Sequence, residues 1–311
     1  MDSRTAFARA MSDKSKSLFP GFECLCQAVA AGEIRLRCGG SGPPLVLLHG
    51  NPQTHLMWHA VAPSLAREFT VYCPDIRGYG ISPKPSSRAD SGAYAKRAMA
   101  GDIFELMDHF GHARFAIVGH DRGARVAHRM AIDCPERVTK LALLDIIPTI
   151  EHFERTDMAF ARAYAHWFYL AMPRPFPEEM IEANPERWLE RHCGRPMPPE
   201  DLFHPEALAD YRACIADPDV ITGICEDYRA AAGIDLEHDR VSRETGRRID
   251  CPLLVLWGET GIIERLYDPL AIWQRYCTTE VQGTCIKGAG HYLAEQAPED
   301  VLTHLFPFLS S

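Results

Sequence analysis

The chain of 311 residues carries 33 lysine and arginine side chains against 42 aspartate and glutamate side chains, a net charge of −9. It therefore lacks a general basic surface for a phosphate backbone, which argues against nucleic acid as a partner. Hydrophobic residues at 46% and charged residues at 24% are typical of a globular protein, and no run approaches the roughly 18 apolar residues of a membrane span.

The N-terminal segment, residues 1–18, has no apolar stretch followed by a small-residue cleavage site, so we expect a flexible tail and not a secretion signal. The chain has eleven cysteines, an odd number, and no CxxC pair. This pattern favours reduced thiols over a disulfide framework or a zinc site. Together these features predict a cytoplasmic protein.

Short apolar runs of strand length recur along the chain. Most do not alternate with polar residues, as is typical of strands buried on both faces of a parallel sheet. Amphipathic stretches of helix length lie between several of them, and such alternation predicts an α/β sheet. The expected strands are 34–38, 44–48, 69–74, 115–118, 140–144, 252–257 and 281–286, and the expected helices include 94–110, 124–134 and 269–276.

This alternation stops between about Pro148 and Asp250, where helical patterns rich in Tyr, Trp, Arg and Pro contain no convincing strand. A helical insertion between two strands predicts a cap over the carboxyl edge of the sheet, where open α/β sheets bind ligands. We therefore expect a core formed by residues 1–148 and 250–311, with a mostly parallel sheet and helices on both faces. The cap would comprise residues 149–249.

The most informative segment spans residues 115–125, in which Asp121 lies between Gly119 and Gly123 at the end of a predicted strand. Small residues two positions away on either side relieve crowding in a sharp strand–turn–helix connection. The central residue then projects above the sheet as a nucleophile. An ordinary Asp helix cap is the alternative, because the spacing alone would also satisfy it.

Two further residues fit a catalytic triad with Asp121. His291 lies in a glycine-rich loop after the last predicted strand and is a candidate general base, while Asp145 ends an earlier strand and could accept the other ring N–H of His291. Each residue alone is also consistent with an ordinary loop or turn position. Their order along an α/β pattern favours a catalytic role.

The loop His49-Gly50-Asn51-Pro52 follows the predicted strand 44–48. Its Asn51 backbone N–H would join the N–H of Arg122 in an oxyanion hole. A second turn begins at Asp75 after the next strand, and for it we favour a structural role, packed on the His49 loop.

An aspartate at the nucleophile position changes the expected chemistry. A carboxylate can displace a leaving group from an sp3 carbon and form an ester that water hydrolyses, whereas a serine would leave an inert ether. Asp121 therefore predicts cleavage of a carbon–halogen bond or an epoxide C–O bond, with His291 activating water in the second step. This disfavours an esterase or a lipase.

The neighbours of Asp121 narrow the substrate. Arg122 and Arg125 are close enough in sequence to lie at the start of one helix, where they could hold a small carboxylate and keep Asp121 ionised. An ordinary surface position is the alternative for each. In the cap, residues 164–169 and 227–229 offer imidazole, indole and phenol donors for a departing halide, or else form the aromatic core of the cap.

At this point the residues resemble a known family, the α/β-hydrolases, and within it the fluoroacetate (haloacetate) dehalogenases. The resemblance extends from residue 19 to the C-terminus. Its most specific pieces are DRGAR at 121–125, HW at 166–167 and EDYRA at 226–230, whereas the HG, DxRGxG and GH motifs occur across the superfamily.

The resemblance implies a role for each candidate residue and suggests a homodimer. It implies Asp121 as nucleophile, His291 as base and Asp145 as the acid that orients His291. Arg122 and Arg125 would bind the substrate carboxylate. The halide pocket, which depends mainly on the resemblance, would consist of His166, Trp167 and Tyr228.

One residue departs from the family pattern. Asn51 stands where many relatives have an aromatic residue. Asparagine at this position resembles the haloalkane dehalogenases, in which a tryptophan follows the nucleophile, but Arg122 occupies that tryptophan position here. The size of the pocket, and with it the preference among haloacids, is therefore open.

The sequence thus predicts a hydrolase without metal or other cofactor that converts a 2-haloacetate, such as fluoroacetate or chloroacetate, into glycolate and halide. An epoxide hydrolase is the alternative, since it shares the aspartate nucleophile and uses cap tyrosines, but it gives the two arginines no role. The candidate tyrosines are Tyr164, Tyr169, Tyr211 and Tyr228. A non-catalytic ligand receptor is a third hypothesis, although no triad member is missing.

Overall fold

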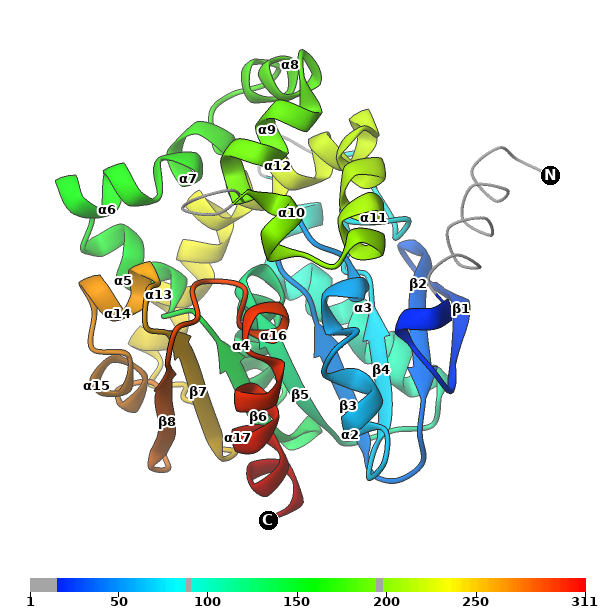
Figure 1. Cartoon of the computed structure of the whole chain (residues 1–311). Coiled ribbons are helices and arrows are strands. Elements are labelled where there is room, and N and C mark those ends of the chain that lie inside the picture. Colours follow the sequence, from blue (N-terminus) through cyan, green and yellow to red (C-terminus); the bar gives the residue numbers. More distant parts are fainter. Residues whose placement is uncertain (1–15, 88–90, 194–197) are drawn as a thin grey trace.

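The computed structural model describes residues 16–87, 91–193 and 198–311 and shows a central sheet with helices on both faces (Figure 1). The sheet has eight strands in the order β1-β2-β4-β3-β5-β6-β7-β8. β2 pairs antiparallel with β1 and β4, and all other neighbours pair parallel. The predicted α/β fold with a mostly parallel sheet is confirmed.

Seven of the strands overlap the apolar runs in the sequence, and every residue of β5 and β7 is buried. β1 was not predicted, because it is an edge strand with a mixed burial pattern and therefore has no continuous apolar run. The strands are β1 (Phe22–Val29), β2 (Gly32–Gly39), β3 (Pro44–Leu48), β4 (Thr70–Pro74), β5 (Phe115–His120), β6 (Val138–Leu144), β7 (Leu253–Gly258) and β8 (Val281–Ile286).

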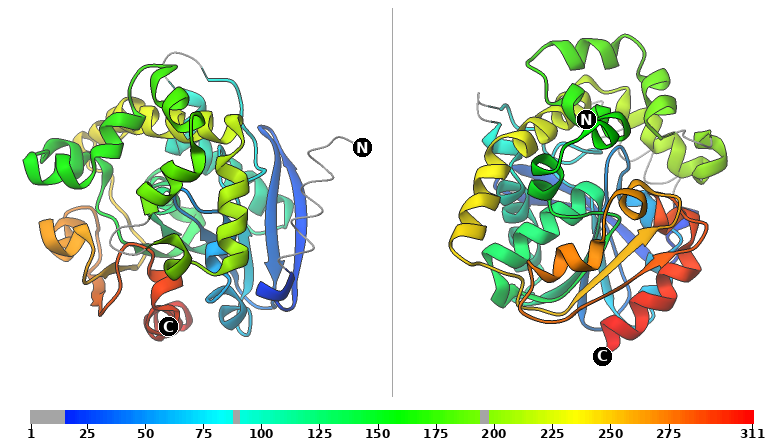
Figure 2. Two further views of the ribbon diagram at one scale, coloured as in Figure 1. Left: turned by 45° about the horizontal axis from the view of Figure 1, so that its top comes forward. Right: turned by 90° about the vertical axis from the view of Figure 1, so that its left-hand side faces the viewer.

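The helices of the core lie on both faces of the sheet (Figure 2). The predicted helix 124–134 begins earlier in the structure, at Asp121, so the candidate nucleophile is the first residue of α4. The core helices are α2 (Ala62–Leu65), α3 (Lys96–His109), α4 (Asp121–Asp133), α14 (Ile262–Leu266), α15 (Pro269–Gln274), α16 (Leu293–Gln296) and α17 (Pro298–Ser310). Short 3-10 helices are η1 (Lys16–Leu18), η2 (His55–Trp58), η3 (Gly92–Tyr94) and η4 (Pro135–Arg137).

A helical cap is inserted between β6 and β7 and lies above the carboxyl ends of the strands (Figure 1). Within the described residues of this insertion no strand is present. Its helices are α5 (Thr149–Glu154), α6 (Met158–Ala163), α7 (Ala165–Leu170), α8 (Phe176–Glu182), α9 (Pro185–Cys193), α10 (Pro199–Leu202), α11 (Pro205–Ile215), α12 (Pro218–Ala232) and α13 (Ile234–Glu244). The domain boundaries at 148/149 and 249/250 stay predictions, and most of the expected tail, 1–18, lies outside the described residues.

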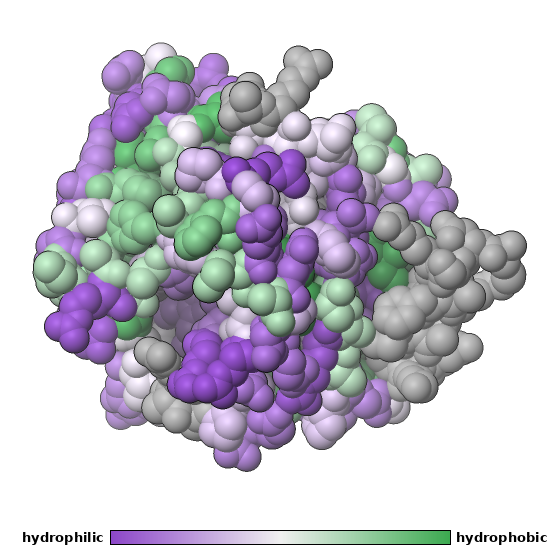
Figure 3. Space-filling model, turned by 90° about the horizontal axis from the view of Figure 1, so that it is seen from above, coloured by the Kyte–Doolittle hydropathy of each residue, from purple (hydrophilic) through white to green (hydrophobic). Residues whose placement is uncertain are grey.

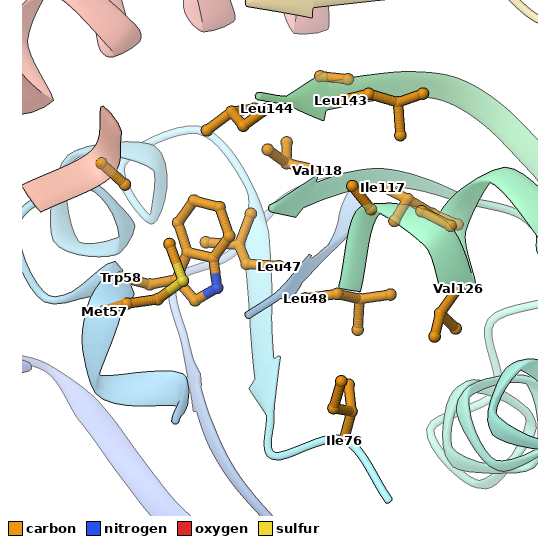
Figure 4. Close-up of a cluster of buried hydrophobic side chains, with 14 of the residues drawn as sticks. Leu47, Leu48, Met57, Trp58, Ile76, Ile117, Val118, Val126, Leu143 and Leu144 are labelled. Atoms are coloured by element: carbon orange, nitrogen blue, oxygen red, sulfur yellow. The ribbon is translucent and has the colours of Figure 1, made fainter. Parts of the chain in front are cut away.

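The hydrophobic core packs around the strands that end beneath the cap (Figure 4). Leu48 of β3, Val118 of β5 and Leu144 of β6 are all completely buried. Met57 and Trp58, from η2, are buried with them. This packing fixes the three strand ends that precede Asn51, Asp121 and Asp145, which makes the fold a rigid support for these residues.

In the described segments, no helix is long and apolar enough to cross a membrane. A search of the same segments finds no group of three or more His, Cys, Asp or Glu side chains placed to hold a metal ion. All eleven cysteines lie in the described part of the chain and are free thiols.

Candidate active site

The candidate nucleophile, Asp121, lies at a sharp turn between β5 and α4. Its backbone φ is +43°, a left-handed value that costs a non-glycine residue energy. A Cβ atom on Gly123 would lie 2.4 Å from the His49 carbonyl oxygen, and one on Gly119 would lie 2.6 Å from the Ala124 Cα. Only glycine therefore fits at both positions, and the turn has the strand–turn–helix geometry expected from the spacing.

The loop after β3 packs directly against this turn. The backbone N–H of Asn51 donates a hydrogen bond to Asp121 Oδ2 at 3.1 Å. The Gly123 N–H donates to the His49 carbonyl at 2.9 Å and fixes the start of α4 on the loop. The Asn51 N–H thus contacts the carboxylate of Asp121, and its role in an oxyanion hole stays a prediction. The parallel role of the Arg122 backbone N–H stays a prediction.

His291 and Asp145 are brought together although they are far apart in the sequence. His291 Nδ1 lies 2.6 Å from Asp145 Oδ2, and the Gly258 N–H donates to Asp145 Oδ1 at 3.1 Å. His120 Nε2 lies 2.8 Å from the His291 carbonyl oxygen and can donate to it. With Nδ1–H given to Asp145, the Nε2 atom of His291 is the one left to accept a proton.

The electrostatics of the triad favour an ionised nucleophile. Burial by itself would raise the pKa of Asp121, but the charges of His291, Arg122 and Arg125 hold that pKa well below its usual value. For His291, burial by itself would lower the pKa, but the hydrogen bond and charge of Asp145, with the charge of Asp121, raise it. Asp121 is therefore a carboxylate at neutral pH, as a nucleophile must be.

Arg122 is a fully buried cation held by an acid from the cap. Its Nε and Nη2 atoms donate to the two carboxylate oxygens of Asp227 at 2.8 and 2.7 Å. Its guanidinium carbon lies 4.2 Å from the centre of the Tyr228 ring. Among the described residues, Nη1 has no hydrogen-bond partner. Arg122 therefore keeps one buried N–H group for a ligand.

Arg125 is the second buried cation, 4% exposed. Its Nη1 atom donates to the Ile147 carbonyl at 3.1 Å and to Thr149 Oγ1 at 3.0 Å. The guanidinium carbon lies 4.6 Å from the centre of the Trp167 ring. The buried Nε atom has no partner in the part of the chain that the structure describes. Neither arginine is the surface residue that the sequence left as an alternative.

The three candidate halide ligands come together in the cap. Trp167 of α7 and Tyr228 of α12 are almost completely buried, with their ring centres 6.1 Å apart. The ring of His166 lies 5.7 Å from that of Tyr228. Because Trp167 and Tyr228 also stack on Arg125 and Arg122, the three donors lie beside the two cations. They are part of the cap's aromatic core and also line the site.

His192 of α9 and Asp227 of α12 are site residues that sequence reasoning missed. Asn51 Nδ2 lies 2.9 Å from His192 Nε2 and 3.4 Å from the Tyr228 hydroxyl. The His192 ring is 4.8 Å from that of His166. Burial lowers the pKa of His192 to about 4, so its ring is neutral at neutral pH. Asp227 could have been noticed as an acid in EDYRA; His192 has no such signal.

The second turn singled out in the sequence, at Asp75, has the expected structural role. The Ile76 N–H donates to His49 Nε2 at 3.0 Å, which packs this turn on the His49 loop. Asp75 itself is completely buried and accepts from His55 Nδ1 at 2.8 Å and from Arg35 Nε at 2.6 Å.

Comparisons with known proteins agree with this geometry. The family model described as alpha/beta hydrolase fold matches residues 43–298. A fluoroacetate dehalogenase from Burkholderia sp is 44% identical over 94% of this chain and 95% of its own length. A soluble epoxide hydrolase from Corynebacterium sp is 31% identical over 87% of this chain and 91% of its own. A crystal structure from Nostoc sp PCC 7120, described as that of a candidate α/β hydrolase, is 49% identical, has a TM-score of 0.90, and matches over 93% of this chain and 98% of its own.

Proposed function

The chain belongs to the α/β-hydrolase fold family, and we propose that it is a dehalogenase that converts a 2-haloacetate into glycolate and halide. The observation that carries this proposal is the pair of buried arginines beside the nucleophile. Arg122 and Arg125 each keep one unpartnered buried N–H group, and both charges act on Asp121. Two such cations suit a substrate whose reacting carbon is attached to a carboxylate.

In the first step, an Asp121 carboxylate oxygen attacks the carbon that bears the halogen. The new bond is an ester C–O bond, and the carbon–halogen bond breaks, so that the halide leaves with the bonding electron pair. The arginines would hold the substrate carboxylate and align this carbon for attack. The indole N–H of Trp167, the hydroxyl of Tyr228 and the ring of His166 supply donors for the departing halide.

In the second step, water hydrolyses the Asp121 ester. His291 Nε2 takes a proton from water as the water oxygen attacks Asp121 Cγ, while Asp145 stabilises the imidazolium. The Asn51 N–H would stabilise the oxyanion that forms on Asp121. The Cγ–O bond to the product then breaks, and the proton on His291 passes to the glycolate oxygen. Asp121 keeps the oxygen atom from water and, as it returns to a carboxylate, releases the second water proton to solvent.

The test is halide and glycolate release from purified protein with fluoroacetate and chloroacetate side by side. We expect Asp121→Ala to lower the rate by about 10⁴-fold or more, because the nucleophile is lost. A single turnover in 18O-water should leave the glycolate unlabelled and label Asp121. Direct water attack would instead label the glycolate fully in the first turnover. Undiminished turnover by Asp121→Ala, checked for normal folding by circular dichroism, would rule the mechanism out.

Epoxide hydrolysis is a second candidate, favoured by the Corynebacterium relative and by the Tyr228 hydroxyl in the site. The other candidate tyrosines support it less. Tyr211 donates to Glu295 and Tyr169 to the Pro177 carbonyl, while Tyr164 stacks on Phe160. Turnover of styrene oxide without haloacetate turnover would establish this alternative. Binding without turnover of either, seen as thermal stabilisation, would indicate a receptor.

We also propose a cytoplasmic homodimer. The eleven free thiols suit a reducing compartment, and a fractionation experiment tests the location.

Apolar side chains gather on part of the cap surface (Figure 3), and such patches are typical of interaction sites. Light scattering on the purified protein tests the dimer. Between residues 158 and 180 of the cap, the exposed large apolar side chains are Met158, Phe168, Met172, Phe176 and Met180.

A further inference from the structure

A pocket with a volume of about 330 Å³ lies toward the C-terminal end of α4. It begins at His128, about two helical turns beyond Asp121. Glu151 of α5 and residues from α13, from the segment that follows α13, and from just after α15 complete it. We call it the arginine pocket, after the five arginines in its lining: Arg129, Arg243, Arg247, Arg248 and Arg275.

The charge in the arginine pocket is not balanced by its own acids. Glu151 and Asp239 are the two carboxylates in the lining, against five guanidinium groups, in a chain whose net charge is −9. Glu151 pairs with Arg275 at 2.7 Å, and Asp239 pairs with Arg129 at 2.7 Å. Arg243 is also paired, with Glu154 outside the lining, at 2.7 Å.

The guanidinium groups of Arg247 and Arg248 have no carboxylate partner closer than 4.0 Å among the described residues. The carboxylate nearest to Arg247 is that of Asp133, at 4.0 Å, the outer limit of an ion pair. Arg248 forms no ion pair or side-chain hydrogen bond within residues 16–87, 91–193 and 198–311. Both lie in the short segment between α13 and β7, and both line the same pocket. Two adjacent guanidinium groups, one paired only at 4.0 Å with Asp133, favour an oxyanion at a concave site, which each can bind through two parallel N–H bonds.

The wall of the pocket formed by α4 supplies a further polar group and apolar surface. His128 is 6% exposed, and its Nε2 atom has no hydrogen-bond partner in the described segments. Its ring packs edge-on against Trp273 at 5.0 Å and against Tyr276 at 6.0 Å. Burial lowers the pKa of His128 to about 3, so the ring is neutral and adds no positive charge. The neighbouring Tyr276 and Ile132 give the pocket an apolar side.

We propose that the arginine pocket binds a small organic oxyanion, with its phosphate or carboxylate group on Arg247 and Arg248. The volume lies at the lower end of the range of small-molecule sites, about 300–1,000 Å³. The carbon skeleton of the ligand would lie against Tyr276 and Ile132. This site is distinct from the one at Asp121, because it shares neither Arg122 nor Arg125.

The experiment is calorimetric titration of the full-length protein with glycerol 3-phosphate and, separately, with citrate, at constant ionic strength. Constant salt is needed because exposed charges are screened. The test variant is Arg247→Ala/Arg248→Ala, and the matched control is Arg67→Ala/Arg114→Ala. All four arginines are exposed, so we expect both variants to fold, which melting curves check.

We expect saturable binding of at least one probe, unchanged in the control variant and weakened at least about tenfold in the test variant, because two charge-assisted contacts are lost. Stronger binding of glycerol 3-phosphate would assign phosphate as the ligand group, and stronger binding of citrate would assign carboxylate. Binding that is equal in both variants would place the anion elsewhere, for example on Arg122 and Arg125, and would overturn the proposal. The proposal would also be overturned if neither probe saturated the wild-type protein below about 10 mM.

Discussion

Two acids of the candidate triad have left-handed backbones, with φ values of +43° at Asp121 and +54° at Asp145. Such conformations cost a non-glycine residue of the order of 1–3 kcal/mol and persist only where the surroundings enforce them. Hydrogen bonds hold both acids in place, because the Asn51 N–H donates to Asp121 and the Gly258 N–H donates to Asp145. Strain at both acids, each at the carboxyl end of a buried strand, supports a functional reading of this edge of the sheet.

The role of Arg125 can be tested by a substitution that keeps its charge. Arg125→Lys preserves a cation near Asp121 but removes the planar group that contacts Thr149, Ile147 and the Trp167 ring. If Arg125 binds the substrate carboxylate, KM for chloroacetate should rise about 10- to 100-fold, with a smaller change in kcat. Steady-state kinetics measure this, with Arg114→Lys on the surface as the control. An unchanged KM would remove Arg125 from the carboxylate site.

Asp227 should matter for stability as much as for function. It is completely buried and holds Arg122, the Tyr79 hydroxyl and Lys96. Asp227→Asn leaves Arg122 charged without its counterion, which should lower the free energy of unfolding by about 3–5 kcal/mol. Urea unfolding measures the change.

An exposed ion pair provides the comparison for Asp227. Arg243 and Glu154 lie 2.7 Å apart, but their side chains are 46% and 42% exposed. Glu154→Gln should therefore cost less than about 1 kcal/mol, because solvent already screens the pair. Equal losses in the two variants would show that Asp227 has no special structural role.

At the scale of elements, α9 illustrates what the cap adds to the site. His192 lies near its end, stacked on Trp188 at 4.5 Å and within hydrogen-bond reach of Asn51 Nδ2. That amide group also approaches the Tyr228 hydroxyl at 3.4 Å. We therefore expect His192 to act as a positioning residue that fixes the Asn51 side chain beside a proposed halide donor.

His192→Phe tests this positioning role, since it keeps an aromatic ring against Trp188 and removes the ring nitrogen. Without the His192 contact, the side-chain amide of Asn51 should hold the Tyr228 hydroxyl less firmly. We expect kcat for fluoroacetate to fall about tenfold and kcat for chloroacetate to fall less, because fluoride is the poorer leaving group and depends more on donors. Halide release from both substrates measures the ratio, with His109→Phe on α3 as the control. A uniform loss on both substrates would argue against a halide-specific role.

The elements that sequence could predict are those whose environment leaves a local pattern. β5 and β7 are buried throughout and read as continuous apolar runs, and the turn at Asp121 is marked by Gly119 and Gly123. By contrast, the contacts that complete the site join residues far apart. Arg122 and Asp227 are 105 positions apart, and Asn51 and His192 are 141 apart. No local pattern records such a pairing, so the prediction of the cap residues His166, Trp167 and Tyr228 depended mainly on the resemblance.

The whole molecule depends on how the cap is held to the core, and buried cap acids provide much of that attachment. Asp210 of α11 accepts from Thr54 Oγ1 at 2.6 Å and from Arg35 at 3.4 Å, both from the core. Asp227 of α12 holds Arg122 in the same way. The contact between Asp227 and Arg122 lies in the candidate site, so cap docking and the geometry around Asp121 are physically linked. Disturbing one should disturb the other.

An acid of the core that accepts a hydrogen bond from the cap makes the attachment of the cap depend on pH. Glu295 of α16 in the core accepts from the Tyr211 hydroxyl of the cap at 3.2 Å and from Gln53 Nε2. Burial raises the pKa of Glu295 to about 8, against these hydrogen bonds, which lower it. Its usual value is 4.5. Between the two values the unfolded chain gives up a proton that the folded chain keeps.

The raised pKa of Glu295 in the folded state determines the direction in which stability changes with pH. The contribution of Glu295 to stability is fully present below about pH 4.5 and is lost as pH rises toward about 8, because the unfolded state increasingly binds fewer protons than the folded state. Glu295→Gln can keep both hydrogen bonds but cannot ionise. Its melting temperature, relative to that of the wild type, should therefore rise between pH 5 and pH 8. Thermal melts across this range measure the difference, with Glu299→Gln, at an exposed position of α17, as the control. A difference that does not change with pH would mean that Glu295 is already ionised in the folded protein and that its bonds to Gln53 and Tyr211 are those of a carboxylate.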